Sequence, residues 1–260
     1  MSLALALSTA CDKIPGLPKR DTSAKSSETS AARTDPSKGS IDLGVGSYAV
    51  AALPTFGGII GTLRIVDSAS FADTLALGVP DCVTRRRTPA PLPAGKQFGN
   101  TLVWIADAKS GKPISATDKR AEISSERCLL DPRVQAVSVG TAVNVINDDR
   151  VLHKLVFTKF GTHDTVLVTS FFNAGEIVAT ERLAKTAGMI EVKCAQHAWE
   201  HGFIAVFDHP YFAVTENNGT FKIDSLAPGS YKLMVWHEGD GKPTEQQVQV
   251  TAGGTATITR

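Results

Sequence analysis

The chain has 260 residues with a formal net charge of +1, and 42% of its residues are hydrophobic and 20% charged. This length is enough to bury a sizeable core, in one large domain or in two smaller ones. Because neither sign of charge dominates, the composition argues against a nucleic-acid or membrane-surface binder.

The first eleven residues are typical of an export signal. A short apolar run, Leu3 to Leu7, precedes Ser8-Thr9-Ala10 and Cys11, and it is too short to span a bilayer. The segment resembles the end of a bacterial lipoprotein signal, with Cys11 as the lipidated first residue, although no Lys or Arg precedes the run and Ser8 stands where Leu is usual. The alternative is an ordinary chain terminus with a spare cysteine.

Residues 12–42 are predicted to form a flexible linker. From Asp12 to about Ser40 the chain is mostly Ser, Thr, Ala, Lys, Asp and Pro. Such a segment buries too little apolar surface to offset the entropy of ordering it. Behind a lipidated cysteine it would let a folded domain stand off a membrane, so we expect a lipid-anchored protein of the periplasm or cell surface.

The rest of the chain is predicted to be all-β. Short runs with apolar alternation recur between Gly, Pro, Asn and Asp residues, and no segment shows a helical stripe of useful length. Many short strands with turns between them favour sandwiches over an α/β fold. The expected strands are Ile59 to Val66, Thr101 to Ile105, Gln135 to Val139, Ala142 to Ile146, Leu152 to Phe157, Val166 to Phe172, Met189 to Lys193 and Phe203 to Phe207.

A second, smaller unit is predicted after His209-Pro210. Its strands are Tyr211 to Thr215, Thr220 to Ile223, Tyr231 to Trp236 and Gln246 to Val250, and Asn218-Gly219 forms a hairpin turn. About fifty residues are near the lower limit for an independent core, so this unit is expected to depend on packing against its neighbour for stability. Ile59 to Val66 and Thr101 to Ile105 are assigned to the first sandwich.

The four cysteines allow two pairing schemes. If Cys11 is lipidated, a Cys82–Cys128 disulfide leaves Cys194 as an odd thiol, which a metal ion would protect. The competing scheme bridges Cys194 to Cys82 or Cys128 and leaves no metal site. The first scheme is preferred because it gives a role to His197, three residues after Cys194.

Two segments resemble the copper-ligand regions of bacterial plastocyanin-like proteins, the cupredoxins. One is Gly140 to Asp149 followed by Val151-Leu152-His153, and the other is Gly188 to His197. The resemblance covers about residues 120 to 207 and implies a Greek-key β-sandwich, which we assign to residues 43–207. It also implies that His153, Cys194 and His197 are three copper ligands, since thiolate and imidazole together suit copper.

The fourth ligand departs from that family. Its members often have Met shortly after the second His, where this chain has Glu200. A carboxylate is a harder ligand than a thioether and favours Cu(II). Glu200 is therefore the candidate axial ligand, with His201 or no ligand as the alternatives.

The tail is similar to carboxypeptidase regulatory-like domains, through Gly219-Thr220-Phe221, Ala227 to Tyr231 and Val235 to Glu238. That resemblance implies a small transthyretin-like antiparallel sandwich over residues 208–260, without catalysis of its own.

Two functions follow. The first is an exported copper protein, not an enzyme, which carries electrons or handles copper in the cell envelope and meets a redox protein partner. It contacts the membrane only through its lipid anchor and binds no nucleic acid. The second is a metal-free adhesion or scaffold module of the cell envelope.

Overall fold

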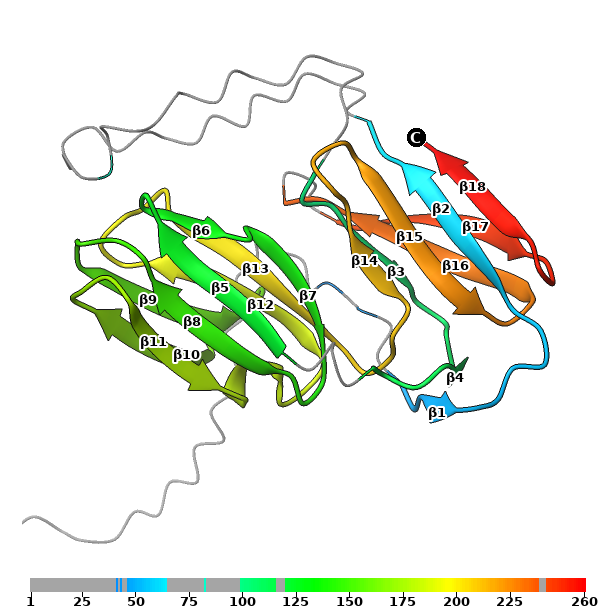
Figure 1. The fold of residues 1–260 in the computed structure, drawn as a ribbon, viewed down its shortest axis with the longest axis horizontal. Helices are drawn as coiled ribbons and strands as arrows, with labels where there is room; N and C mark the ends of the chain where they lie inside the picture. Colours follow the sequence, from blue (N-terminus) through cyan, green and yellow to red (C-terminus); the bar gives the residue numbers. More distant parts are fainter. Residues whose placement is uncertain are drawn as a thin grey trace, which may run out of the picture. The chain divides into compact units, whose positions relative to one another are not determined.

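The computed structural model describes residues 41, 43, 46–64, 82, 99–115, 120–238 and 242–260. These residues form β-strands and turns, with a short 3-10 turn at Arg182–Ala184, and this confirms the all-β prediction (Figure 1). None of them belongs to a helix long and apolar enough to cross a membrane. The predicted signal segment with Cys11, and nearly all of the predicted linker, lie outside the described residues.

The first sandwich consists of two mixed sheets. In the larger sheet the strand order is β10 (Thr165–Phe171), β9 (His153–Lys159), β12 (Gly188–Cys194), β13 (His201–Phe207) and β7 (Val134–Ser138). In the smaller sheet the order is β11 (Glu176–Thr180), β8 (Ala142–Asn147), β5 (Arg120–Glu126) and β6 (Leu129–Asp131). The pairs β13–β7 and β5–β8 are parallel, and the other neighbours are antiparallel.

One core lies between these two sheets. Along β8, Val143 and Val145 are buried while their neighbours are only half-buried, as expected for a strand with one face inward. They pack with Leu155 and Phe157 of β9 and with Val192 of β12 in a single apolar cluster. This core holds the strands β9 and β12, which carry the first two predicted ligands.

The second sandwich combines strands from both ends of the described chain. One sheet has the order β14 (Phe212–Val214), β3 (Leu102–Ile105), β16 (Gly229–Trp236) and β17 (Thr244–Val250). The other has the order β15 (Thr220–Leu226), β2 (Gly57–Thr62) and β18 (Thr255–Thr259). A short parallel pair joins β1 (Ala49–Val50) to β4 (Ser110–Gly111).

The assignment of the strands before residue 106 to the first sandwich is wrong. Figure 1 shows β2 between β15 and β18, and β3 pairs with β14 and β16. Two glycines allow β2 to lie this close to its neighbours in the second sandwich. A Cβ at Gly57 would meet backbone oxygens of Thr251 and Gly254, and one at Gly61 would meet the ring of Phe221. The region assigned as 43–207 therefore holds the first sandwich only from residue 120 onward.

Two strands are buried on both faces. All four residues of β3 are buried, as are the last six residues of β13. Their outward residues, with Val134, Met189 and Trp236, form a further apolar cluster shared by strands of the two sandwiches. Such two-sided burial explains why these strands are continuous apolar runs rather than alternating ones.

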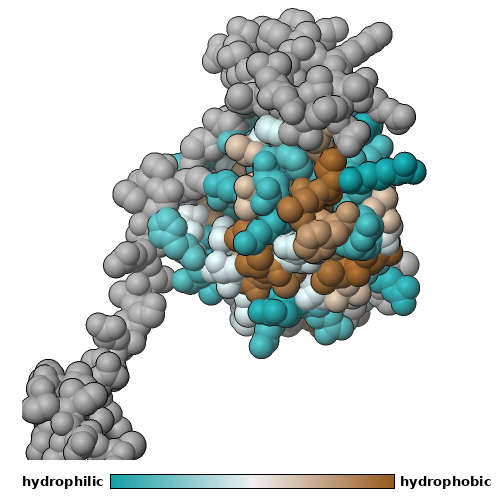
Figure 2. All heavy atoms as spheres, turned by 90° about the vertical axis from the view of Figure 1, so that its left-hand side faces the viewer, coloured by the Kyte–Doolittle hydropathy of each residue, from teal (hydrophilic) through white to brown (hydrophobic). Residues whose placement is uncertain are grey.

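The exposed apolar side chains of the first sandwich lie on and beside its edge strands β10 and β11. Figure 2 shows this side of the protein, where apolar residues are interspersed with polar ones. The large exposed apolar residues of this sandwich are Leu152, Val168, Phe172 and Ile177. Leu152 and Phe172 adjoin His153 and Phe171, which are directly paired in β9 and β10, so these two exposed residues are neighbours.

Candidate metal centre

Two adjacent strands and one turn bring the predicted ligands together. His153 is the first residue of β9 and Cys194 the last residue of β12, and these strands pair with Cys194 opposite Leu155. The turn from Cys194 to β13 is closed by backbone hydrogen bonds, in which Cys194 N–H donates to Glu200 O and Glu200 N–H donates to His197 O. This turn therefore directs Cys194, His197 and Glu200 to the same side.

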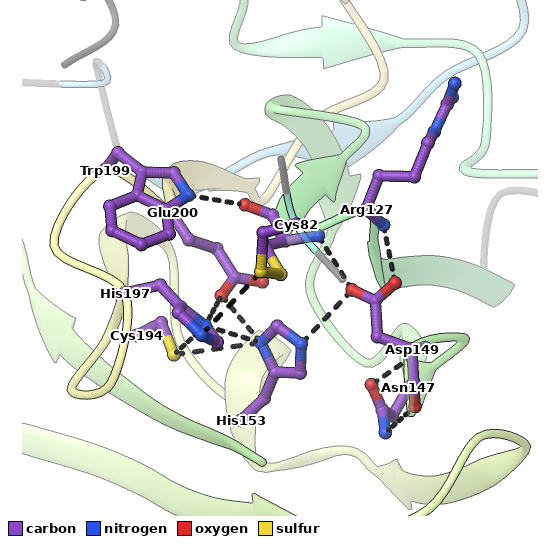
Figure 3. The surroundings of a disulfide bond; sticks show 10 residues. Cys82, Arg127, Asn147, Asp149, His153, Cys194, His197, Trp199 and Glu200 are labelled. Atoms are coloured by element: carbon purple, nitrogen blue, oxygen red, sulfur yellow. Dashed lines mark hydrogen bonds and ion pairs between the residues drawn. A yellow bond between two sulfur atoms is a disulfide. The ribbon is translucent and has the colours of Figure 1, made fainter. Parts of the chain in front are cut away.

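Four donor atoms converge in this place (Figure 3). Cys194 Sγ lies 3.8 Å from His153 Nδ1 and 3.6 Å from His197 Nδ1, and the two Nδ1 atoms are 3.3 Å apart. Glu200 Oε2 lies 2.7 Å from His153 Nδ1 and 3.3 Å from His197 Nδ1. All four atoms lie within 4.8 Å of one another, and all four residues are buried.

These spacings suit one shared ion. Four ligand atoms at about 2.0–2.3 Å from a first-row metal ion lie roughly 3.3–3.8 Å apart when they surround it tetrahedrally. Most of the observed separations fall in that range, and only the His153–Glu200 contact is shorter, as for an ion pair. One thiolate, two imidazoles and a carboxylate also form a donor set suited to copper.

The same groups perturb one another's protonation. Burial lowers the pKa of His153, but hydrogen bonds to Asp149, Cys194 and Glu200 outweigh it and raise that pKa to about 11. Contacts with Cys194 and Glu200 raise the pKa of His197 to about 9. Burial favours the neutral forms of Glu200 and Cys194, but the two imidazoles outweigh it, lowering the pKa of Glu200 to about 2 and also lowering that of Cys194. Without metal at pH 7, both imidazoles are therefore protonated and Glu200 is ionised.

Asp149 holds the far side of the His153 ring. Its Oδ2 lies 3.1 Å from His153 Nε2, so an N–H at Nε2 leaves the lone pair of Nδ1 for a metal ion. The side-chain oxygen of Asn147 accepts from Asp149 N–H, and the Asn147 amide donates to Asp149 O. Asp149 is a site residue that was not predicted from the sequence, where its position four residues before His153 is the available signal.

A strained turn lies against the same carboxylate. Arg127 and Cys128, between β5 and β6, both have positive φ, near 56° and 57°, which is unusual for residues other than glycine. Their two N–H groups donate to Asp149 Oδ1 and Oδ2, each at 2.7 Å. One carboxylate therefore fixes this turn and the His153 ring together.

The Cys82–Cys128 disulfide is present and Cys194 is a buried free thiol, so the preferred pairing scheme is confirmed and the competing one is wrong. Trp199 lies beside the disulfide, and its Nε1–H donates to Cys128 O at 3.0 Å. The indole also lies 5.1 Å from the His197 ring, measured between ring centroids. The disulfide and Trp199 thus cover the edge of His197 that faces away from Cys194.

His201 lies outside the donor cluster. Its Nδ1 contacts Trp199 O, and its Nε2 contacts Arg133 and, at 3.2 Å, Glu238 Oε2. Of the two side chains considered for the axial position, only Glu200 has a donor atom in the cluster.

Two sequence comparisons match this chain to polysaccharide lyases. Residues 207–258 match the family model of polysaccharide lyase family 4, domain II. A curated relative, "Probable rhamnogalacturonate lyase A" of Aspergillus flavus, is 31% identical over 105 residues, which are 39% of this chain and 19% of that protein. The chain therefore spans about a fifth of the relative's length. The family match supports a β domain like domain II of polysaccharide lyase family 4 over residues 207–258, rather than the carboxypeptidase regulatory-like family that the tail's motifs resemble.

The similar solved structures include copper proteins. A purple cupredoxin from Nitrosopumilus maritimus is 21% identical, with a TM-score of 0.28, and the match covers 33% of this chain and 98% of that one. An amicyanin variant with Cu(I) is 16% identical, with a TM-score of 0.30 and coverages of 36% and 85%. A copper-containing nitrite reductase from Thermus scotoductus is 21% identical, with a TM-score of 0.31 and coverages of 40% and 24%.

Proposed function

We propose that this protein is an exported copper-binding protein that transfers electrons or handles copper in the cell envelope. The observation that carries the proposal is the convergence of Cys194 Sγ, the Nδ1 atoms of His153 and His197, and Glu200 Oε2 within one buried space. Bound copper would supply a one-electron change between Cu(I) and Cu(II). The protein's part is to hold the donors, exclude water and set the local charge.

The sheet around the site supports electron transfer with little rearrangement. His153 and Cys194 belong to neighbouring strands of a five-stranded sheet, and His197 and Glu200 are held by the hydrogen-bonded turn that follows. Side chains fixed by packing and hydrogen bonds keep the same positions when the charge at the site changes. All four ligands therefore stay in place in both oxidation states.

The charge of the site favours Cu(II). With neutral imidazoles, Cys194 and Glu200 supply two negative charges, and Asp149 adds a third behind His153. Cu(II) neutralises more of this buried negative charge than Cu(I) does, and a carboxylate also prefers the harder ion. We therefore propose a low reduction potential, which suits copper handling or electron transfer to a low-potential partner.

The proposed setting is the periplasm or the cell surface, with Cys11 lipidated and residues 12–42 as the tether. An oxidising compartment agrees with the Cys82–Cys128 disulfide. The proposed partner is a redox protein, and we propose no enzymatic activity, no contact with nucleic acid, and no contact with a membrane except through the lipid anchor. The second sandwich serves as a module without catalysis of its own.

Adding Cu(II) to the purified, disulfide-intact chain tests the proposal. An intense visible charge-transfer band with one equivalent of copper is expected, and Cys194→Ser should abolish the band. Cys11→Ser in both proteins removes the one cysteine that belongs neither to the disulfide nor to the proposed copper site. A correctly folded protein that stays colourless and binds no stoichiometric copper contradicts the proposal.

A second candidate function rests on the tail. The match of residues 207–258 to a lyase domain II supports a β-domain module in the tail. As the alternative we propose a metal-free scaffold that presents β-sandwich surfaces to a cell-envelope partner. The same copper titration separates the two, since only the scaffold predicts no colour and no bound copper.

A further inference from the structure

The two ring nitrogens of His197 face different groups. Its Nδ1 lies among the donor atoms of the candidate copper site, 3.6 Å from Cys194 Sγ. Its Nε2 faces the disulfide, 4.0 Å from Cys82 Sγ (Figure 3). The His197 ring therefore lies between the copper site and the disulfide and contacts both.

His153 and His197 differ in what their second nitrogen contacts. His153 Nε2 meets the Asp149 carboxylate, a strong acceptor. The Nε2 atom of His197 meets a disulfide sulfur, which is a weak acceptor and has no proton to donate. A ligating histidine normally gives this second N–H to a carboxylate, a carbonyl or water. The Nε2 atom of His197 is therefore poorly satisfied while the disulfide is intact.

We propose that Cys82, Cys128 and His197 Nε2 form a second metal site, for Cu(I), when the disulfide is reduced. The three donor atoms lie within 4.8 Å of one another, and all three residues are buried. A dithiol reductant would supply two electrons and two protons to break the S–S bond, becoming a disulfide itself. The two thiols then lose their protons to bulk water as Cu(I) binds, as does His197 Nε2–H when Nδ1 already holds an ion, and two Cu–S bonds and one Cu–N bond form.

The donor set selects a soft ion. Two thiolates and one imidazole make a three-coordinate set without oxygen, which matches Cu(I). Trp199 and Val151 pack against the cysteine pair, so water has little access to it. This site lacks the carboxylate of the first one, so the two sites differ in the oxidation state they favour. The inference goes beyond the proposed function and does not need copper at the first site.

The test is a Cu(I) titration of the full chain carrying Cys11→Ser, without oxygen, against a coloured Cu(I) chelator. Cu(I) is supplied as its acetonitrile complex, and the reductant is removed beforehand. The oxidised protein is expected to bind one equivalent and the reduced protein two. Cys82→Ser/Cys128→Ser is the control and should bind one equivalent under both conditions. The inference is overturned if reduction adds no equivalent, or if the control gains one.

A second pair of variants separates this site from the first one and from simple binding to free thiols. Cys194→Ser removes the first site's thiolate, but the reduced protein should still gain the reduction-dependent equivalent. Adding His197→Ala should weaken that equivalent by about tenfold or more, since losing a direct ligand costs at least as much as losing a group behind one. Equal Cu(I) affinity with and without His197 would show that the cysteines act without the imidazole, and this also overturns the inference. Failure of the copper proposal is different: no coloured Cu(II) complex forms in the oxidised protein.

Discussion

His153 Nε2 lies 3.1 Å from Asp149 Oδ2, and the same carboxylate accepts the N–H groups of Arg127 and Cys128. A single side chain thus links the histidine of β9 to the turn that carries half of the disulfide. Its neighbour Asp148 is exposed.

Asp149→Asn is expected to lower copper affinity about 10–100-fold, because the His153 ring loses the charged acceptor that orients it. Competition with a copper chelator measures the effect. Asp148→Asn is the matched control and should leave the affinity unchanged. Equal affinities in the two variants would show that Asp149 does not position the ligand.

Substitution of Glu200 should raise the reduction potential of bound copper. Removing the negative charge of a direct ligand weakens the site's preference for Cu(II) over Cu(I), so Glu200→Gln should raise the potential by on the order of 100 mV. Glu200→Met should raise it further, because a thioether favours Cu(I). Redox titration of the visible band measures both variants. An unchanged potential and band in both would exclude Glu200 as a ligand.

Copper affinity should rise steeply with pH. The pKa values of about 11 for His153 and about 9 for His197 mean that both imidazoles are protonated in the metal-free protein at pH 7. Binding must then release at least these two protons, so the association constant should grow at least roughly a hundredfold per pH unit between pH 6 and 8. Calorimetry in buffers of different ionisation enthalpy counts the protons. A count near zero would contradict the assigned charges.

The contact between Glu238 and Arg133 should make the free energy of unfolding depend on pH in the acidic range. Burial favours protonated Glu238, but His201 and Arg133 outweigh it and lower its pKa to about 2. A lowered carboxyl pKa stabilises the fold above its usual value of 4.5, and this stabilisation is lost as the pH falls from 4.5 towards 2.

Glu238→Gln should therefore cost about 1.5–3 kcal/mol at pH 7 and less near pH 3, measured by urea unfolding. Glu245→Gln, at an exposed pair with Lys232, is the control and should cost under about 1 kcal/mol at both pH values. A cost for Glu238→Gln that does not change with pH would refute the ionic contribution.

The segment that matches the lyase family should not fold alone. Residues 207–260 lack β2, the middle strand of one sheet, and β3, an inner strand of the other. The isolated segment is expected to give an unfolded circular dichroism spectrum, and addition of a peptide spanning residues 43–115 should restore strand signal. Dispersed amide resonances from residues 207–260 alone would contradict this.

The local parts of the site were predictable from sequence, and the contacts between distant segments were not. Cys194 and His197 are three residues apart in one turn, so their donor types and spacing were visible directly. The approach of Cys82 to His197 joins positions 115 residues apart, and no periodic pattern records such a contact. Alternation likewise predicted that β2 and β3 are strands but not which sandwich they join, because a period of two marks a buried face and not a partner.

The order of strands along the chain has a consequence for how the protein is made. Strands β5 to β13 build one sandwich without interruption, whereas β2 and β3 pair only with strands that follow it. During synthesis the ligand-bearing sandwich is complete once residue 207 has emerged. At that point β2 and β3 have been made, but the strands with which they pair have not. The metal-binding sandwich can therefore fold before the second sandwich, which is completed last because its strands come from both sides of the first one in the chain.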